Sequence, residues 1–143
     1  MITIGLQPGH RMGMASLRLM PARGRVPARW IGGVVSGATS VQEIRQTVTT
    51  LAHRHGSEHL VVADAGSASG ATLSWQIDVL EQAGLTVVRT HAADVTEWAL
   101  PRLRAALLDT LVDRDPLCAR AMALALWGAV QKQGLPDPVM AES

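Results

Sequence analysis

Five apolar runs of strand length alternate with turn signals along the chain, at residues 2–7, 12–20, 29–36, 59–64 and 85–90. The first three follow one another with only short connections, which is typical of antiparallel hairpins. The last two are separated by segments with helical periodicity, which is typical of parallel strands joined by crossover helices. The pattern therefore predicts a mixed, five-stranded sheet.

Four helices are predicted between and after these strands, over residues 40–55, 72–82, 94–111 and 116–133. We expect Asp94 to cap the third helix and Pro101 to break or bend it. Pro116 suits the first position of the last helix, whose apolar stripe is expected to be buried. The resulting order, β-β-β-α-β-α-β-α-α, indicates an α/β fold with helices on both faces of the sheet.

The length of 143 residues, with 48% hydrophobic and 17% charged residues, suits one packed domain. We assign this domain to residues 1–133 and expect 134–143 to form a flexible tail. Cys118 is the single cysteine, which excludes disulfides and cysteine-based zinc sites. The chain has no signal-peptide pattern and no apolar run of membrane-spanning length, so we expect a cytoplasmic protein without a membrane partner.

Positive charge is concentrated in the first third of the chain. Residues 1–42 contain no acidic residue and five arginines, namely Arg11, Arg18, Arg23, Arg25 and Arg29. Arginine suits bidentate contact with phosphate, although a GC-rich coding sequence also enriches it. The segregation predicts a positive end of the fold that binds nucleic acid through these five side chains, with Trp30 as a candidate for base stacking.

Polar residues close three of the predicted strands: Gln7, Asp64 and the pair Thr90-His91. In open α/β sheets, ligands bind beyond the carboxyl ends of the parallel strands, so we expect these residues to converge. Asp64 alone is equally consistent with a turn before Gly66. Clustered carboxylates would instead favour a hard cation such as Mg²⁺, and His10 and His91 are further candidates for a ligand or a general base.

Several segments resemble RuvC-type Holliday-junction resolvases and their smaller YqgF relatives. Residues 4–11 (IGLQPGHR) are similar to the first motif of that family, which reads apolar-Gly-apolar-Asp-Pro-Gly. Residues 61–64 (VVAD) match the second motif, in which an apolar strand ends in an acid. Residues 87–95 resemble the segment after the fifth strand, and the alanine-rich 119–125 resembles the last helix. The resemblance runs over nearly the whole chain.

The resemblance implies a ribonuclease-H-like fold, with a five-stranded mixed sheet flanked by helices. It also implies a homodimer that acts on branched or structured nucleic acid, DNA rather than RNA. If the chain is active, it is a Mg²⁺- or Mn²⁺-dependent endonuclease that hydrolyses phosphodiester bonds. The catalytic positions of the family then fall on Gln7, Asp64 and Asp115, of which Asp64 and Asp115 are able to bind metal.

The sequence departs from the family at the acidic positions. Gln7 replaces the first-strand aspartate, and an amide supplies no charge to hold Mg²⁺. In the resolvase alignment the acids of the last helix fall on Leu117 and Arg120, whereas in the YqgF-like alignment a single acid falls on Asp115. Arg120 would place a cation near the site.

Three functions remain open on these grounds. The first is a nucleic-acid-binding protein that has lost or weakened its nuclease activity and needs no metal. The second is an active Mg²⁺-dependent endonuclease, either a junction resolvase or an RNA-processing nuclease. The third is a dimeric interaction module that uses the exposed face of the final helix.

Overall fold

The computed structural model describes the strands, two of the helices and single residues of the others, namely residues 2–7, 12–38, 43, 46, 50, 59–64, 77, 78, 81, 82, 86–106 and 116–138. The strands are β1 (Ile2–Gln7), β2 (Met12–Met20), β3 (Arg29–Ala38), β4 (His59–Asp64) and β5 (Val87–Thr90). The helices are α3 (Ala92–Ala105) and α5 (Pro116–Trp127), and α5 continues into a π-helical turn, η1 (Gly128–Lys132).

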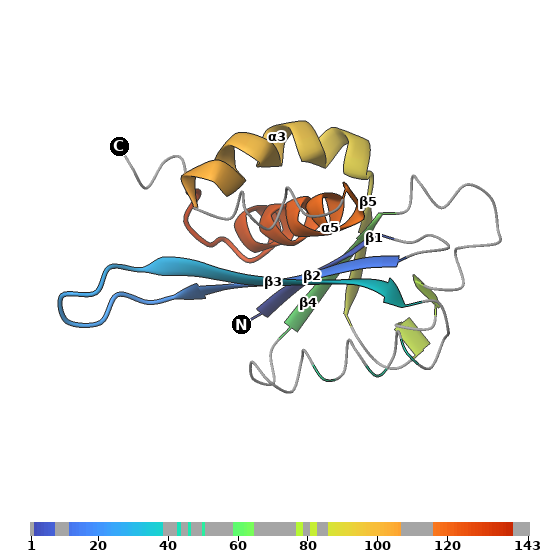
Figure 1. The fold of residues 1–143 in the computed structure, drawn as a ribbon, viewed down its shortest axis with the longest axis horizontal. Helices are drawn as coiled ribbons and strands as arrows, with labels where there is room; N and C mark the ends of the chain where they lie inside the picture. The colour runs from blue at the N-terminus through green and yellow to red at the C-terminus, as the bar shows by residue number, and fades with distance from the viewer. Residues whose placement is uncertain are drawn as a thin grey trace.

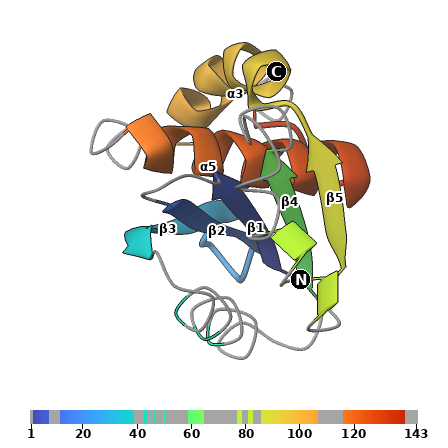
Figure 2. The ribbon, with the colours of Figure 1, turned by 90° about the vertical axis from the view of Figure 1, so that its right-hand side faces the viewer.

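The five strands form one mixed sheet in the order β3-β2-β1-β4-β5. β1, β2 and β3 pair antiparallel, whereas β1, β4 and β5 pair parallel, so their arrows in Figure 2 point the same way. The prediction that residues 2–7 and 59–64 are adjacent parallel strands is confirmed. The strand boundaries differ slightly, since β3 continues to Ala38 and β5 begins at Val87 rather than residue 85.

The two described helices lie on the same side of the sheet. α5 packs directly on β1 and β2, and α3 covers α5 (Figure 1). The other face of the sheet has its own apolar contacts, because Ile4, Leu6 and Ile77 are fully buried. None of the helices in the described ranges is long and apolar enough to cross a membrane.

Arg89 on β5 connects the sheet to the predicted helix 72–82. Its guanidinium donates hydrogen bonds to Glu81, the shortest 2.7 Å long, and to Asp78 at 2.8 Å. The bonds to Glu81, and then that to Asp78, raise the pKa of Arg89 above its ordinary value. Asp78 and Glu81 are both helical, in agreement with the predicted helix; the other residues of that segment, apart from Ile77 and Gln82, lie outside the described residues.

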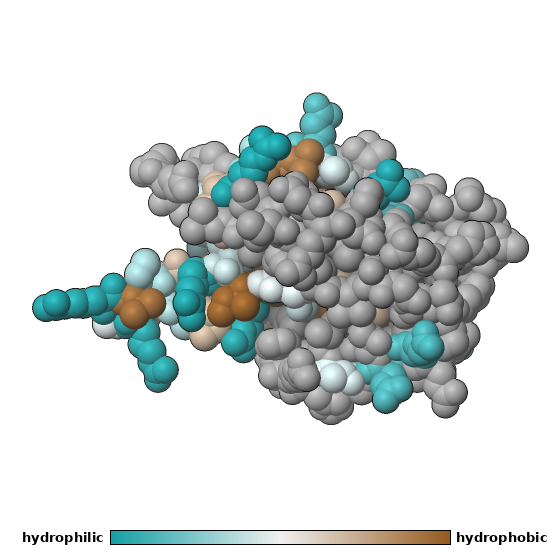
Figure 3. All heavy atoms as spheres, viewed as in Figure 1, coloured by the Kyte–Doolittle hydropathy of each residue, from teal (hydrophilic) through white to brown (hydrophobic). Residues whose placement is uncertain are grey.

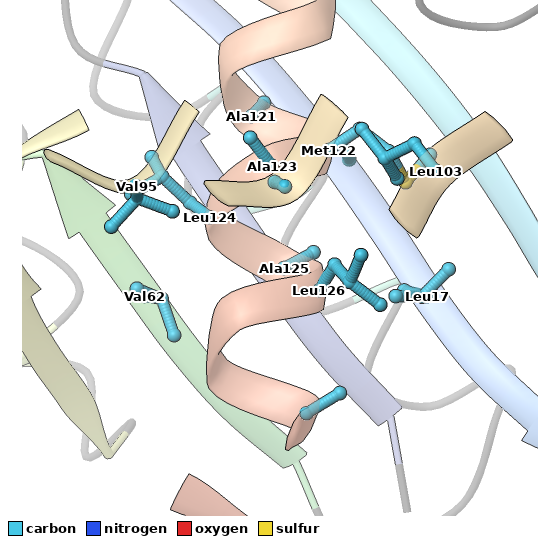
Figure 4. Close-up of a cluster of buried hydrophobic side chains, with 13 residues drawn as sticks. Leu17, Val62, Val95, Leu103, Ala121, Met122, Ala123, Leu124, Ala125 and Leu126 are labelled. Atoms are coloured by element: carbon cyan, nitrogen blue, oxygen red, sulfur yellow. The ribbon is translucent and has the colours of Figure 1, made fainter. Parts of the chain in front are cut away.

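The middle of helix α5, residues 121–126, is buried all the way round rather than along one stripe. Every residue from Ala121 to Leu126 is buried, with the sheet on one side and α3 on the other (Figure 4). A helix enclosed on two sides needs apolar residues at consecutive positions, and this explains the sequence Ala-Met-Ala-Leu-Ala-Leu. Residues 121–126 thus offer no exposed face. The exposed residues of the predicted final helix that the structure describes are Arg120, Gln131 and Lys132, and an interaction module built on that helix stays a prediction.

Glycine at position 5 lets α5 approach the sheet very closely. A Cβ atom on Gly5 would lie 1.7 Å from the main-chain oxygen of Ala121 and 2.9 Å from the nitrogen of Ala125. At the other end of the contact, a Cβ on Gly128 would lie 2.4 Å from Cγ2 of Val62. Helix backbone thus rests on strand backbone, and α5 runs antiparallel to β1 and β4.

Helix α3 corrects two predictions from the sequence. It begins at Ala92 with His91 as the N-cap, so Asp94 lies inside the helix and is not the cap. His91 has the extended backbone that is usual for an N-cap, and the two alanines that follow are strong helix formers. Pro101 does not break the helix, which continues to Ala105 because packing on α5 offsets the lost hydrogen bond. Residues 107–111 lie outside the described ranges.

The segment after α5 is attached to both layers. Thr3 on β1 donates a 2.8 Å hydrogen bond to Oε1 of Gln133. Further along, Asp137 accepts a 2.9 Å hydrogen bond from Arg102 of α3, whose guanidinium also stacks 4.2 Å above the ring centre of Trp98. The first residues of the expected tail, 134–138, are thus held against α3, and residues 139–143 lie outside the described ranges.

We expect Gly5→Ala to destabilise the fold by at least ~3 kcal/mol, the upper end of overpacking costs, because its methyl group would meet main-chain atoms that cannot rotate away. Gly33→Ala is the matched control, since its Cβ would meet only the Ser16 hydroxyl at 3.5 Å, an ordinary contact. Urea denaturation of both variants measures the difference. Equal stability of the two variants would contradict the close contact.

Candidate functional site

Three polar residues stand in a row at the carboxyl edge of the parallel strands. Leu6 pairs with Ala63, so the next residues, Gln7 and Asp64, are neighbours on β1 and β4. Asp64 in turn pairs with Thr90 on β5. Neighbouring strands are about 4.8 Å apart, so Gln7, Asp64 and Thr90 span roughly 10 Å. The predicted convergence of these strand ends is confirmed.

All three side chains lie on the face of the sheet that α5 covers. Gly5 faces α5, and residues alternate along a strand, so Gln7 faces the same way. Val62 lies against Gly128, the first residue of η1, which continues α5. Asp64, two residues after Val62, therefore lies on that face as well. Thr90 follows as the pairing partner of Asp64.

The first turns of α3 and α5 lie at the same edge. α3 begins two residues after Thr90, with the exposed His91 between them. Ala121 of α5 lies over Gly5, and Pro116 is five residues before it, roughly 7.5 Å along the helix axis. Gln7 lies two residues beyond Gly5, roughly 6.6 Å along the strand, so the start of α5 is level with Gln7. Both helix dipoles therefore point their positive ends toward this edge.

Burial makes the chemistry of this edge depend on its charges. Gln7 is 1% exposed and Asp64 is 2% exposed. Among Gln7, Asp64 and Thr90, the possible oxygen ligands are one amide, one carboxylate and one hydroxyl, and the carboxylate is the one acidic group of the three. No group of three His, Cys, Asp or Glu side chains occurs among the described residues. This set is poorer in charge than a paired-metal site requires.

Several predicted site residues lie outside the described ranges. They include Asp115, which immediately precedes Pro116 in the sequence, and His10 and Arg11, which follow β1. Arg120, the other residue expected near the metal, is exposed, unlike Gln7 and Asp64. Its approach to the edge and the role of Asp115 stay predictions.

The predicted nucleic-acid-binding arginines that are described lie on the β2–β3 hairpin, far from this edge. Its outer part, residues 20–29, projects beyond the body of the domain and is called the arm below (Figure 1). The arm carries Arg23, Arg25 and Arg29, and Arg18 lies next to its base. Residues 21–29 are all exposed. Figure 3 shows hydrophilic side chains that project from the arm around a smaller hydrophobic surface.

The tip of the arm is a tight two-residue turn. Arg23 and Val26 exchange two backbone hydrogen bonds of 2.9 and 3.0 Å, with Gly24 and Arg25 between them. Gly24 has φ of +61°, a conformation that glycine adopts without strain. Val26 is 55% exposed, and sequence reasoning missed it as a candidate contact. The sequence feature that could have indicated Val26 is its position between Arg25 and Pro27, in a turn without other apolar side chains. Trp30 instead packs against the core, which argues against base stacking.

Strand polarity separates the arm from the carboxyl edge. Gln7 pairs with Gly13 at the start of β2, and the chain then runs antiparallel to β1 toward Gly24. Eleven residues at about 3.3 Å each place the turn roughly 36 Å from Gln7. The structure thus brings Gln7 and Asp64 together and keeps Arg23 and Arg25 away from them.

Comparison with solved structures identifies this architecture. The chain is similar to Thermus thermophilus RuvC, with a TM-score of 0.60 and 22% identity over 94% of this chain and 97% of that one. The chain shares the RuvC fold. It is also similar to the fowlpox virus Holliday junction resolvase, with a TM-score of 0.58 and 11% identity over 94% of this chain and 100% of the other. The expected ribonuclease-H-like fold is confirmed. No protein-family model and no curated protein matches the sequence.

We expect Gln7→Asp to lower stability in EDTA, because it places a second carboxylate about 5 Å from Asp64. At an effective dielectric constant of ~20, that repulsion is about 3 kcal/mol. Added Mg²⁺ or Mn²⁺ is expected to restore the melting temperature. The double variant Gln7→Asp/Asp64→Asn keeps one charge and is the control, with stability that is independent of the cation. A Gln7→Asp protein as stable as the wild type in EDTA would contradict the proximity of the two side chains.

Proposed function

We propose that this chain is a branched-DNA-binding protein of the Holliday-junction resolvase type whose nuclease activity is lost or strongly weakened. The fold supports the resolvase type, since it is shared with RuvC and with a viral Holliday junction resolvase. The loss of activity is supported by Gln7, an amide beside Asp64 where the family has a carboxylate.

The replacement of one charge carries this proposal. Hydrolysis of a phosphodiester by paired divalent cations activates a water and stabilises the leaving oxygen. Each cation must be held by anionic oxygens, because Mg²⁺ gives up its hydration shell reluctantly. In a buried edge, replacing a carboxylate by an amide removes electrostatic attraction worth kilocalories per mole. With Asp64 as its one described carboxylate, the edge is poorly equipped for that chemistry.

An active endonuclease is the second candidate, and Asp64 favours it. Asp64 is buried at the end of β4 next to Gln7, and a carboxylate is the type of ligand that a hard divalent cation prefers. In this case Asp115 would supply the second acid, Mg²⁺ or Mn²⁺ would be the cofactor, and a four-way junction or a precursor RNA would be the substrate. We propose a homodimer in either case, because paired sites are needed to act on both strands of a junction symmetrically.

We expect the wild-type protein to cleave synthetic four-way junctions very slowly or not at all at millimolar Mg²⁺. Gln7→Asp is expected to raise the rate, and adding Arg120→Asp is expected to raise it more than additively if both side chains face the same cation. Gel assays of labelled junctions measure the rate, and Asp64→Asn in the same background is the inactive control. Rapid cleavage by the wild type would favour the second candidate.

Binding without cleavage is expected to depend steeply on salt. Each phosphate contact by an arginine releases counterions, so the affinity falls as salt is added. In a plot of log affinity for duplex DNA against log salt concentration, each contact contributes about −0.9 to the slope. Fluorescence anisotropy of a labelled junction between roughly 50 and 200 mM salt measures this slope. An affinity independent of salt, or no binding to junction, duplex or RNA, would contradict the proposal.

A further inference from the structure

The arm is a second contact surface, separate from the carboxyl edge and built for a polyanion. It carries Arg23, Arg25 and Arg29, and no acidic residue occurs anywhere in residues 1–42. Residues 21–29 are all exposed, so the arginines are available without any rearrangement of the body. An arm with this charge is repelled by another copy of itself and attracted to phosphate.

Backbone pairing and two prolines restrict the conformations of the arm. Met20 pairs with Arg29 at its base, and Arg23 pairs with Val26 at its tip. Between these two pairs, Pro21 on one strand and Pro27 on the other fix the backbone φ. A two-residue turn closes the tip. Because the prolines cannot donate to a further strand, the arm is poorly suited to extend a sheet with a partner protein.

The dimensions of the arm select one groove. A two-stranded β-ribbon fits the major groove of B-form DNA, about 12 Å wide, and is too broad for the minor groove of about 6 Å. The major groove of an RNA duplex is deep and narrow, and side chains cannot read it. The exposed Val26 at the tip suits an apolar contact such as the methyl group of thymine.

We propose, on the basis of the function proposed above, that the arm inserts into the major groove of a DNA duplex arm about one helical turn from the carboxyl edge. The turn at Gly24 is roughly 36 Å from Gln7 along the sheet, and one turn of B-form DNA is about 34–36 Å long. The protein thus holds the branch point at the edge and one duplex arm at the tip.

Junction arm length tests this inference. Four-way DNA junctions with arms of about 8 bp (about 27 Å) are too short to reach the tip, whereas arms of about 20 bp (about 68 Å) extend beyond it. We expect wild-type protein to bind the long-armed junction about tenfold more tightly. We expect Arg23→Ser/Arg25→Ser to lose that advantage and to bind the short-armed junction as the wild type does. Its salt slope on long arms should fall by about 1.8, the value for two phosphate contacts.

Controls separate the possible outcomes. Arg104→Ser, which removes an exposed arginine of α3, is the matched control for the single variant Arg25→Ser in the binding assay. Neither substitution should change the fold, as judged by circular dichroism. Equal binding of both junctions by the wild type would overturn the role of the arm and leave the proposed function standing. No binding of either junction would overturn the proposed function itself. A change in oligomeric state of the double variant, measured by light scattering, would make the arm a protein contact and overturn the inference.

Discussion

The contact between Gly5 and the backbone of α5 is the constraint on which the arrangement depends. Because no side chain separates strand from helix at this point, α5 lies closer to the sheet than an ordinary helix would. A helix so close to β1 has room for small residues only, and Ala121 and Ala125 occupy the contact. The same contact fixes where α5 starts, and thus brings its first turn level with Gln7 and Asp64.

A second layer follows from the first. With α5 pressed against β1 and β2, its outer surface would be apolar and exposed unless another element covered it. Helix α3 supplies this cover, with Val95, Ala99 and Leu103 buried against α5. The hydrogen bond from Arg102 to Asp137 then ties the end of the chain to α3. The core is consequently aliphatic and layered, which suits a chain without Phe or Tyr.

The strand ends of the site were predictable because pattern and polarity are local properties. An apolar run that stops at Asp64 reveals the strand end, and parallel pairing with β1 follows from the intervening helical segment. The enclosure of α5 had a signal in the sequence, since residues 121–126 are six consecutive apolar residues, but the sequence does not show which element covers the second face of the helix. The start of α3 at Ala92 was missed because Asp94 has the side chain of a good cap, whereas His91 is the N-cap without a capping hydrogen bond from its side chain. The distance of the arm from the site was implied by the predicted hairpin, in which Gly13 lies beside Gln7 and every later residue of β2 is farther away.

The charges of the molecule are distributed along this same strand axis. Gln7 brings no charge to the buried edge, which α3 and α5 approach with their positive dipole ends. The proposed function implies that the edge needs no neutralising cation. A carboxylate in its place would lie about 5 Å from Asp64 and would make the edge depend on a cation. The arm at the opposite end has no acid to compensate its arginines. Under the proposed function, a polyanion would be attracted first to the arm, and the edge would meet it afterwards as a surface of lower charge. Such an order would agree with the proposed function, in which the protein holds a branched duplex in place, more than with a site that must assemble metal ions on it.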